Sequence, residues 1–198
     1  MKLRLLLSSA LALGCCSVLP SIPNVQQRDW PLDVHRPSAL PPRPRGRTLM
    51  VRTIRAGSGL DVRGLQWLQS DGSVHVDFYE RWAVPPAQAV EDDLRRWLAD
   101  AGLFSGVVAQ GSRLSTDFIL EGELNSFMAD LNVGVARVAL ALVLMDQRPN
   151  PIKVLLQKTE RAETKLNGTD PPAIAEAMKA ALSEVLRLSE ADVAQAVH

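Results

Sequence analysis

The sequence is nearly free of cysteine: Cys15 and Cys16 stand side by side near the start, and no cysteine follows them. A disulfide inside the folded part is therefore excluded, and with it the framework of a small disulfide-stabilised domain. Net charge is absent too, because 22 Lys and Arg residues balance 22 Asp and Glu residues. This balance does not indicate the basic surface of a nucleic-acid-binding protein, so we expect no nucleic acid among the partners.

Histidine is scarce, and no catalytic motif accompanies it. The three histidines are His35, His75 and His198, which lie far apart in the sequence and belong to no local metal-binding or catalytic motif. Neither a metal site nor a Ser-His-Asp triad is predicted. Glu121 and Glu123 share one face of a predicted strand, as paired catalytic carboxylates would, but alternation on a half-exposed strand gives the same pattern. We expect no enzyme, no metal and no cofactor.

The apolar run at the start is too short to span a bilayer, which takes about 20 residues. Residues 1–14 have instead the parts of a secretion signal: a basic start, an apolar segment at 5–13, and small or apolar residues before Cys15. This pattern resembles a bacterial lipobox, where the signal is cut before a cysteine that is then acylated. We predict lipidation of Cys15, with Cys16 as the alternative. An ordinary secretory signal without lipidation is the other interpretation.

Several acyl chains together hold a protein on a membrane effectively permanently. No Asp follows Cys15, so a signal for retention at the inner membrane is missing. We therefore expect the protein to be lipid-anchored on the periplasmic face of the outer membrane.

The next segment is rich in proline. It contains Pro20, Pro23, Pro31, Pro37, Pro41, Pro42 and Pro44. This composition predicts a lipid-anchored, Pro-rich linker over residues 15–47. Its roughly 30 residues would reach up to about 90 Å as polyproline II. Residues 30–33 alternatively form a first edge strand. The remaining chain is predicted to form one domain at 48–188 and a C-terminal tail at 189–198.

Apolar patterning predicts strands at 49–55, 65–69, 74–82, 103–108, 117–129, 133–145 and 152–163. Asp71-Gly72 is the turn of a hairpin. Helices are predicted at 87–101, capped by Gly102, and at 172–188, with Asp170 as the N-cap. Both faces of the strand at 133–145 are apolar, so we expect helices on both sides of the sheet. The predicted fold class is an α/β sandwich of a mixed, largely antiparallel sheet and two main helices.

Several segments, in this order, resemble a known family. They are Asp77–Pro86 with the pattern Tyr-x-x-Trp-Ala-x-Pro-Pro, the helix ending Arg96-Trp97-Leu98, and Leu120–Leu124 before a long apolar strand. They are similar to the ABC-type transport auxiliary lipoproteins, the paraquat-inducible protein C-like components of mammalian-cell-entry (MCE) lipid transport systems. The resemblance extends over about residues 28–188.

The resemblance implies an anticodon-binding-domain-like fold, as in the amino-terminal domain of TolB. It also implies a non-enzymatic auxiliary component of an ABC/MCE-type lipid transport system that docks the trans-envelope MCE protein. The ABC permease and ATPase are then further partners, and a homo-oligomeric ring is the implied arrangement.

Aromatic residues and prolines gather at the end of the strand at 74–82. Tyr79, Trp82, Pro85 and Pro86 either seal an edge of the core or form a rigid docking surface, and Trp67 on the preceding strand is expected beside them. These five are the predicted partner contacts.

The alternative function is that of a periplasmic carrier that itself binds lipid. Its pocket would lie between helix and sheet, where the small side chains of Ala139 and Ala141 leave room for an acyl chain.

Overall fold

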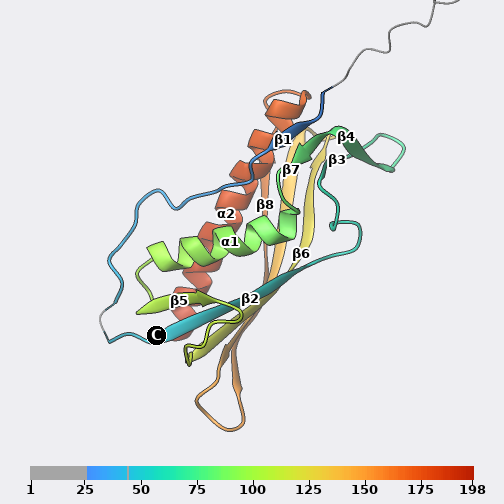
Figure 1. The fold of residues 1–198 in the computed structure, drawn as a ribbon. Helices are drawn as coiled ribbons and strands as arrows, with labels where there is room; N and C mark the ends of the chain where they lie inside the picture. The colour runs from blue at the N-terminus through green and yellow to red at the C-terminus, as the bar shows by residue number, and fades with distance from the viewer. Residues whose placement is uncertain (1–25, 44) are drawn as a thin grey trace, which may run out of the picture.

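The computed structural model describes residues 26–43 and 45–198 and builds them around one eight-stranded sheet (Figure 1). The strands are β1 (Arg28–Trp30), β2 (Thr48–Ala56), β3 (Gly64–Leu68), β4 (Val74–Trp82), β5 (Gly106–Ala109), β6 (Phe118–Asp130), β7 (Val135–Asp146) and β8 (Lys153–Lys165). The helices are α1 (Pro86–Asp100) and α2 (Pro171–Val197). The predicted α/β sandwich with a mixed sheet and two main helices is confirmed.

Strand β6 organises the sheet. One of its edges pairs with β7 along the whole strand, and β7 pairs in turn with β8, so the predicted antiparallel meander is present. The other edge is shared: the first half of β6 pairs with β2, and its last two residues pair with β3. The sheet therefore divides into a β2–β5 arm and a β3–β4–β1 arm.

The expectation of a largely antiparallel sheet is wrong. Four of the seven strand pairings are parallel and three are antiparallel. Three of the parallel pairs join strands before α1 to strands after it, because a helical crossover returns the chain to the sheet in the direction that parallel pairing needs. The fourth pairs β1 with β4, which both precede α1. The turn residues from which the sequence analysis predicted hairpins indicate only antiparallel pairs of neighbouring strands.

Local rules explain how α2 begins and how α1 ends. The Asp170 carboxylate accepts a hydrogen bond from the backbone N–H of Ala173 at 2.9 Å, which caps α2 as predicted. Gly102 follows α1 with φ +65°, in the left-handed region that suits glycine after a helix.

Helix α2 continues nine residues beyond its predicted end, so the predicted tail at 189–198 is wrong for nearly its whole length. Ser189 interrupts the apolar stripe of the helix in the sequence, yet it is completely buried. Its hydroxyl donates to the carbonyl of Val185 at 2.8 Å, so the polar group is satisfied inside the helix. Val193, one turn further, is completely buried as well.

Both helices pack on the same face of the sheet (Figure 1). Val138, Leu140, Leu142 and Leu144 of β7 point into one core that also contains the buried stripes of α1 and α2. The expectation of helices on both sides is therefore wrong. The second face of β7 is mostly half-buried, because no helix of the described chain covers it.

The predicted Pro-rich linker is part of the domain from about residue 28 onward. Strand β1 pairs in parallel with the end of β4, so an edge strand forms here at 28–30 and shares only Trp30 with the alternative predicted at 30–33. Leu32 and Val34 are buried in the core. Backbone hydrogen bonds from Leu40 to the Asp100 carbonyl and from Arg43 to the Phe104 carbonyl fix the rest. We call residues 31–43 the strap, because this segment runs outside α1 (Figure 1).

The strap shortens the tether to the predicted lipid. Only about a dozen residues separate Cys15 from β1, and they reach at most about 40 Å when fully extended. The reach of about 90 Å expected from the whole Pro-rich stretch is therefore wrong. Across the described ranges, helices lack the combination of length and apolar character that crossing a membrane requires.

Candidate interaction surfaces

The aromatic and proline cluster divides between the core and the surface. Trp82 is 1% exposed and packs against Phe127 with ring centroids 5.4 Å apart. Pro86 is buried at the start of α1, whereas Pro85 is half-buried at its N-cap position. Burial removes Trp82 and Pro86 from any docking surface, and their role is to seal the core edge.

Trp67 and Tyr79 have separate surroundings. The Trp67 ring stacks on His75 with centroids 4.2 Å apart and packs against the core, so its aromatic contact is His75 and not the predicted group. Tyr79 is 42% exposed and lies edge-on to Phe78, with ring centroids 5.2 Å apart. Tyr79 therefore remains available to a partner.

Phe78 is the surface residue that the sequence analysis missed. It is 70% exposed, more than the other large hydrophobic side chains of the described residues, and Val74 and Val76 on the same strand are also exposed. The signal was present in the sequence, because these three are alternate residues of a hairpin strand. The pattern was used only to predict a hairpin strand at 74–82.

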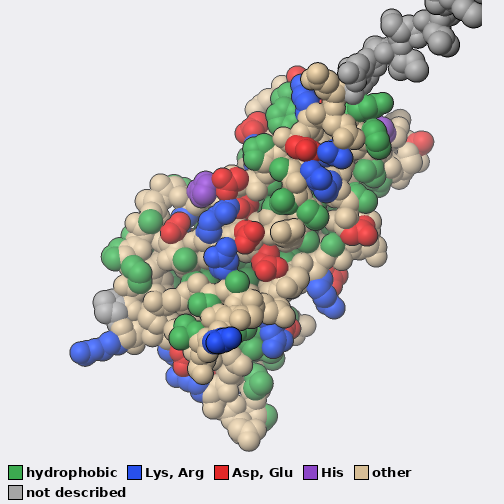
Figure 2. Space-filling model, viewed as in Figure 1, with side chains coloured by type: hydrophobic (Ala, Val, Ile, Leu, Met, Phe, Trp, Pro, Cys, Tyr) green, Lys and Arg blue, Asp and Glu red, His purple; other side chains and the backbone are tan. Residues whose placement is uncertain are grey.

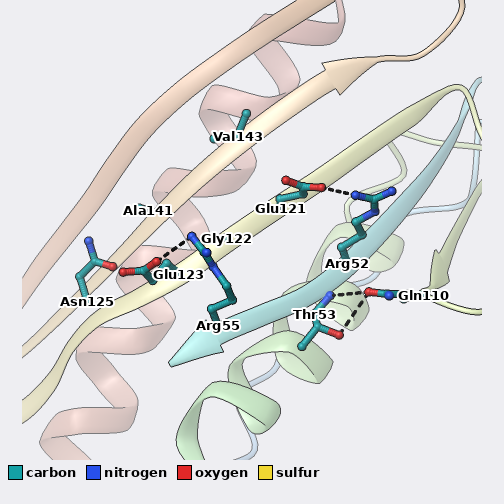
Figure 3. Close-up of a pocket in the computed structure, with 10 residues that line it drawn as sticks. All are labelled: Arg52, Thr53, Arg55, Gln110, Glu121, Gly122, Glu123, Asn125, Ala141 and Val143. Atoms are coloured by element: carbon teal, nitrogen blue, oxygen red, sulfur yellow. Dashed lines mark hydrogen bonds and ion pairs between the residues drawn. The ribbon is translucent and has the colours of Figure 1, made fainter. Parts of the chain in front are cut away.

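The face of the sheet without helices holds a shallow hollow of about 560 Å³ (Figure 3). Its floor includes Gly122 of β6 with Ala141 and Val143 of β7. Two ion pairs join β2 to β6 along its side, Arg52 with Glu121 and Arg55 with Glu123, the latter at 2.9 Å. We call this surface, defined by these seven residues, the open face.

The open face does not have the properties of a catalytic site. Glu121 and Glu123 point outward from the same face of β6 as predicted, but each carboxylate is engaged by its own arginine. Both side chains are about 40% exposed, so neither is the buried, unpaired carboxyl that general acid catalysis needs. Within residues 26–43 and 45–198, no cluster of His, Cys, Asp and Glu is arranged to hold a metal ion.

Ala139 and Ala141 do not face the helices. Ala141 lies opposite Glu123 and lines the open face, and Ala139 is two residues before it on the same side of β7. The helix-facing side is filled by the leucines of the core. The place assumed for an acyl chain between helix and sheet is therefore wrong, and the carrier interpretation loses the observation on which it depended.

One carboxyl with an unusual pKa holds the strap to α1. Asp93 is completely buried, accepts the backbone N–H of Val34 at 3.1 Å and forms an ion pair with Arg96, which also binds Asp33. Burial raises the pKa of Asp93 to about 7, against the opposing effects of the Val34 hydrogen bond and the Arg96 charge.

A second carboxylate joins the strap to both helices. Glu190 of α2 accepts hydrogen bonds from the Arg36 guanidinium at 3.1 and 3.2 Å and from the Trp97 indole N–H at 2.7 Å. These contacts are structural, and they explain why α2 continues through this polar position.

The predicted lipidation site, Cys15, lies outside the described residues, as does Cys16. Its assignment therefore remains a prediction from the sequence.

Comparison with known proteins agrees with the resemblance seen in the sequence. A family model described as "ABC-type transport auxiliary lipoprotein component" matches residues 31–188. No curated protein matches the chain.

Among solved structures, a Xanthomonas campestris protein of family DUF330 is similar with a TM-score of 0.71 and 20% identity, over 85% of this chain and 96% of that one. A hypothetical protein of Chlamydia trachomatis is similar with a TM-score of 0.56 and 10% identity, over 77% and 98% of the two chains. At these identities the likeness concerns the fold.

Proposed function

Because the chain belongs to the family of ABC-type transport auxiliary lipoprotein components, we propose that it is a non-enzymatic, outer-membrane-anchored component of an MCE-type lipid transport system. In this role it docks the MCE protein that spans the periplasm, while an ABC permease and its ATPase supply the energy. The observation that carries the proposal is the family match over residues 31–188, which is nearly the whole folded part.

The anchor is the acylated Cys15. Several acyl chains, at about 0.8 kcal/mol for each buried methylene group, attach the chain to the bilayer permanently. The short tether between Cys15 and β1 then keeps the domain within about 40 Å of the membrane surface.

The open face is the surface through which the protein binds the MCE partner. It is hollowed, lies on the side of the sheet away from both helices, and combines an apolar floor with a row of charges. Since the charges alternate in sign, they give a partner a specific pattern to match without adding net charge.

The proposal is tested by affinity purification from native membranes. The full chain with a C-terminal tag is solubilised in mild detergent, and co-purifying proteins are identified by mass spectrometry. We expect an MCE-domain protein and its permease. If the acylated chain is abundant and no MCE protein accompanies it, the proposed function is wrong.

The docking surface is tested by exchanging the two members of an ion pair. The double variant Arg52→Glu with Glu121→Arg keeps an ion pair within the chain but reverses the charges presented to the partner. The matched control is Glu184→Arg with Arg187→Glu, which exchanges an exposed pair on α2. We expect the first variant, and not the second, to recover less MCE protein. Equal recovery by both would exclude this part of the open face from docking.

A further inference from the structure

Exposed hydrophobic side chains are concentrated on the β3–β4 hairpin. Val74, Val76, Phe78 and Tyr79 are exposed to 46, 44, 70 and 42%. Figure 2 shows hydrophobic side chains gathered over this corner of the molecule. Val133, which is 61% exposed, lies in the adjacent β6–β7 turn, which is joined to the hairpin by a hydrogen bond from Asn132 to the Gln69 carbonyl. We call the four β4 residues the hairpin patch.

The backbone holds the aromatic pair of the hairpin patch outward. The Asp77 carboxylate accepts the backbone N–H groups of Tyr79 at 2.7 Å and of Glu80 at 2.9 Å. The pairing of β4 with β3 is irregular here, and Gly64 permits the close approach, because a Cβ on it would lie 2.3 Å from the Asp77 carbonyl oxygen. A bulge of this kind is a device that re-aims side chains at a sheet edge.

The hairpin patch lies where the described chain begins. Gln27 donates a side-chain hydrogen bond to the Phe78 carbonyl at 3.2 Å, and β1 follows alongside β4 (Figure 1). The predicted lipid on Cys15 is about twelve residues before Gln27. The hairpin patch is thus the exposed apolar surface with the shortest path along the chain to the acyl anchor.

The opposite end of the sheet is much farther from the anchor. The twelve residues of β7 cover about 40 Å, and the β7–β8 hairpin at its far end exposes Ile152 and Val154. The tether itself reaches at most about 40 Å. A domain held by this tether therefore brings the hairpin patch to the bilayer far more readily than it brings the far hairpin.

Two kinds of contact engage the charged groups around the hairpin patch: some form ion pairs, whereas the carboxylates of Asp71 and Asp77 accept hydrogen bonds from neighbouring residues of the hairpin. Arg28 forms an ion pair with Glu80, and Asp29 binds both Arg63 and Arg81 at 3.0 Å. Contact with a lipid headgroup layer therefore places none of these ion-paired charges alone in an apolar environment, and the carboxylates of Asp71 and Asp77 stay at the hydrated level of the headgroups. Tyrosine is an aromatic residue enriched at membrane interfaces, where its ring and hydroxyl meet different surroundings.

We propose that the hairpin patch rests on the lipid bilayer that carries the acyl anchor, with Phe78 and Tyr79 at the level of the headgroups. This proposal rests on the acyl anchor of the proposed function. The domain then stands with the β3–β4 hairpin on the membrane, and its β7–β8 hairpin points away from it.

The test uses the acylated full chain in vesicles of phosphatidylethanolamine and phosphatidylglycerol. In a Cys16→Ser background, Phe78→Cys is labelled with an environment-sensitive fluorophore, and Ile152→Cys is labelled in the same way as the matched control. Each is measured in vesicles with and without a lipid whose acyl chain carries a nitroxide quencher near the headgroup. We expect blue-shifted emission and quenching for the label at position 78, and neither for the label at position 152.

The other outcomes separate the two proposals. A chain that floats with the vesicles while both labels behave alike overturns the membrane contact and leaves the anchor intact. A label at position 78 that is blue-shifted but not quenched shows that protein covers the hairpin patch, which also overturns it. A chain that does not float with the vesicles overturns the anchor and this proposal together.

Discussion

The buried carboxyl of Asp93 is expected to make the stability of the domain depend on pH in an unusual direction. Burial raises its pKa from 3.8 to about 7. Between about pH 4 and pH 7 the folded state therefore binds a proton that the unfolded state does not bind. By linkage, the free energy of unfolding falls as the pH rises through this window.

The size of this effect follows from the two pKa values. At about 1.4 kcal/mol for each pKa unit, the shift from 3.8 to about 7 lowers the free energy of unfolding by at most about 4 kcal/mol. The side chain of Arg96, the partner of Asp93, is 38% exposed, so solvent screens the charges at this site. We therefore expect the free energy of unfolding to fall by on the order of 2 kcal/mol. The other charged groups that face Asp93 are Asp33 and His35 on the strap.

The perturbation is Asp93→Asn, which keeps an oxygen to accept the Val34 N–H but cannot ionise. Urea unfolding of residues 26–198, followed by tryptophan fluorescence at constant ionic strength from pH 4.5 to 8, measures both proteins. We expect similar stabilities near pH 4.5. At pH 8 the variant should exceed the wild type by about 2 kcal/mol.

The opposite pattern would refute this reasoning. A variant that loses stability relative to the wild type as the pH rises would show that the Arg96 ion pair outweighs the cost of burial. The pKa of Asp93 would then be lowered in the folded state, not raised. Parallel curves would show that Asp93 has nearly the same pKa in both states.

Three further predictions concern the core, the lipid anchor and the stability at acid pH. Trp82→Ala should lower the free energy of unfolding by about 3–5 kcal/mol, while Tyr79→Ala at the surface should lower it by less than about 1 kcal/mol. If urea titrations gave equal losses of stability for the two variants, the assigned burial would be contradicted. Cys15→Ser should abolish labelling by a palmitate analogue and leave the melting temperature of the full chain unchanged, and label that persists would move the lipid to another residue. A hydrogen bond from Arg148 lowers the pKa of Asp146 to about 2, so this carboxylate stabilises the fold above about pH 4 and loses that effect as the pH falls toward 2. In an acid titration, Asp146→Asn should therefore lose less stability than the wild type between about pH 4 and pH 2, and identical titrations would exclude the effect.

Features governed by neighbouring residues could be predicted from the sequence. The Asp71-Gly72 turn, the Asp170 cap and the three-strand meander all depend on signals within a few residues or on one strand following another. Gly72 indeed has φ +84°, as a hairpin turn of this kind requires. The family resemblance extended this reading to the fold as a whole.

Features governed by distant residues could not be predicted. The parallel pairing of β2 with β6 joins positions about 70 residues apart, and no local pattern encodes it. Leu32 and Val34 lie among prolines, and the groups that hold that segment on the domain, such as Asp93 of α1 and Glu190 of α2, are distant in the sequence. The length of α2 was missed because the partners of Glu190 are Arg36 and Trp97, on other elements.

The candidate surfaces show the same limit. Periodicity correctly placed Glu121 and Glu123 on one face of a strand, but it could not tell that their partners are arginines of β2. It also could not separate Trp82 from Tyr79, since a bulge between two strands decides which of the aromatic side chains is buried.

The shared edge of β6 has a consequence for the order in which the chain becomes folded. Strands β2 and β3 are made early in synthesis, but neither pairs with the other, and both depend on β6, which begins at Phe118. A nascent chain that ends before this residue has the β3–β4 hairpin, α1 and the β2–β5 pair on which that helix packs, but it lacks the strand that joins the two arms. Folding therefore waits for contacts of long sequence separation, which are slow to form. Until β6 arrives, the β2 edge that pairs with it and the apolar side chains that pack against β6 are uncovered, and we expect this interval to be the one in which the protein most needs protection from aggregation.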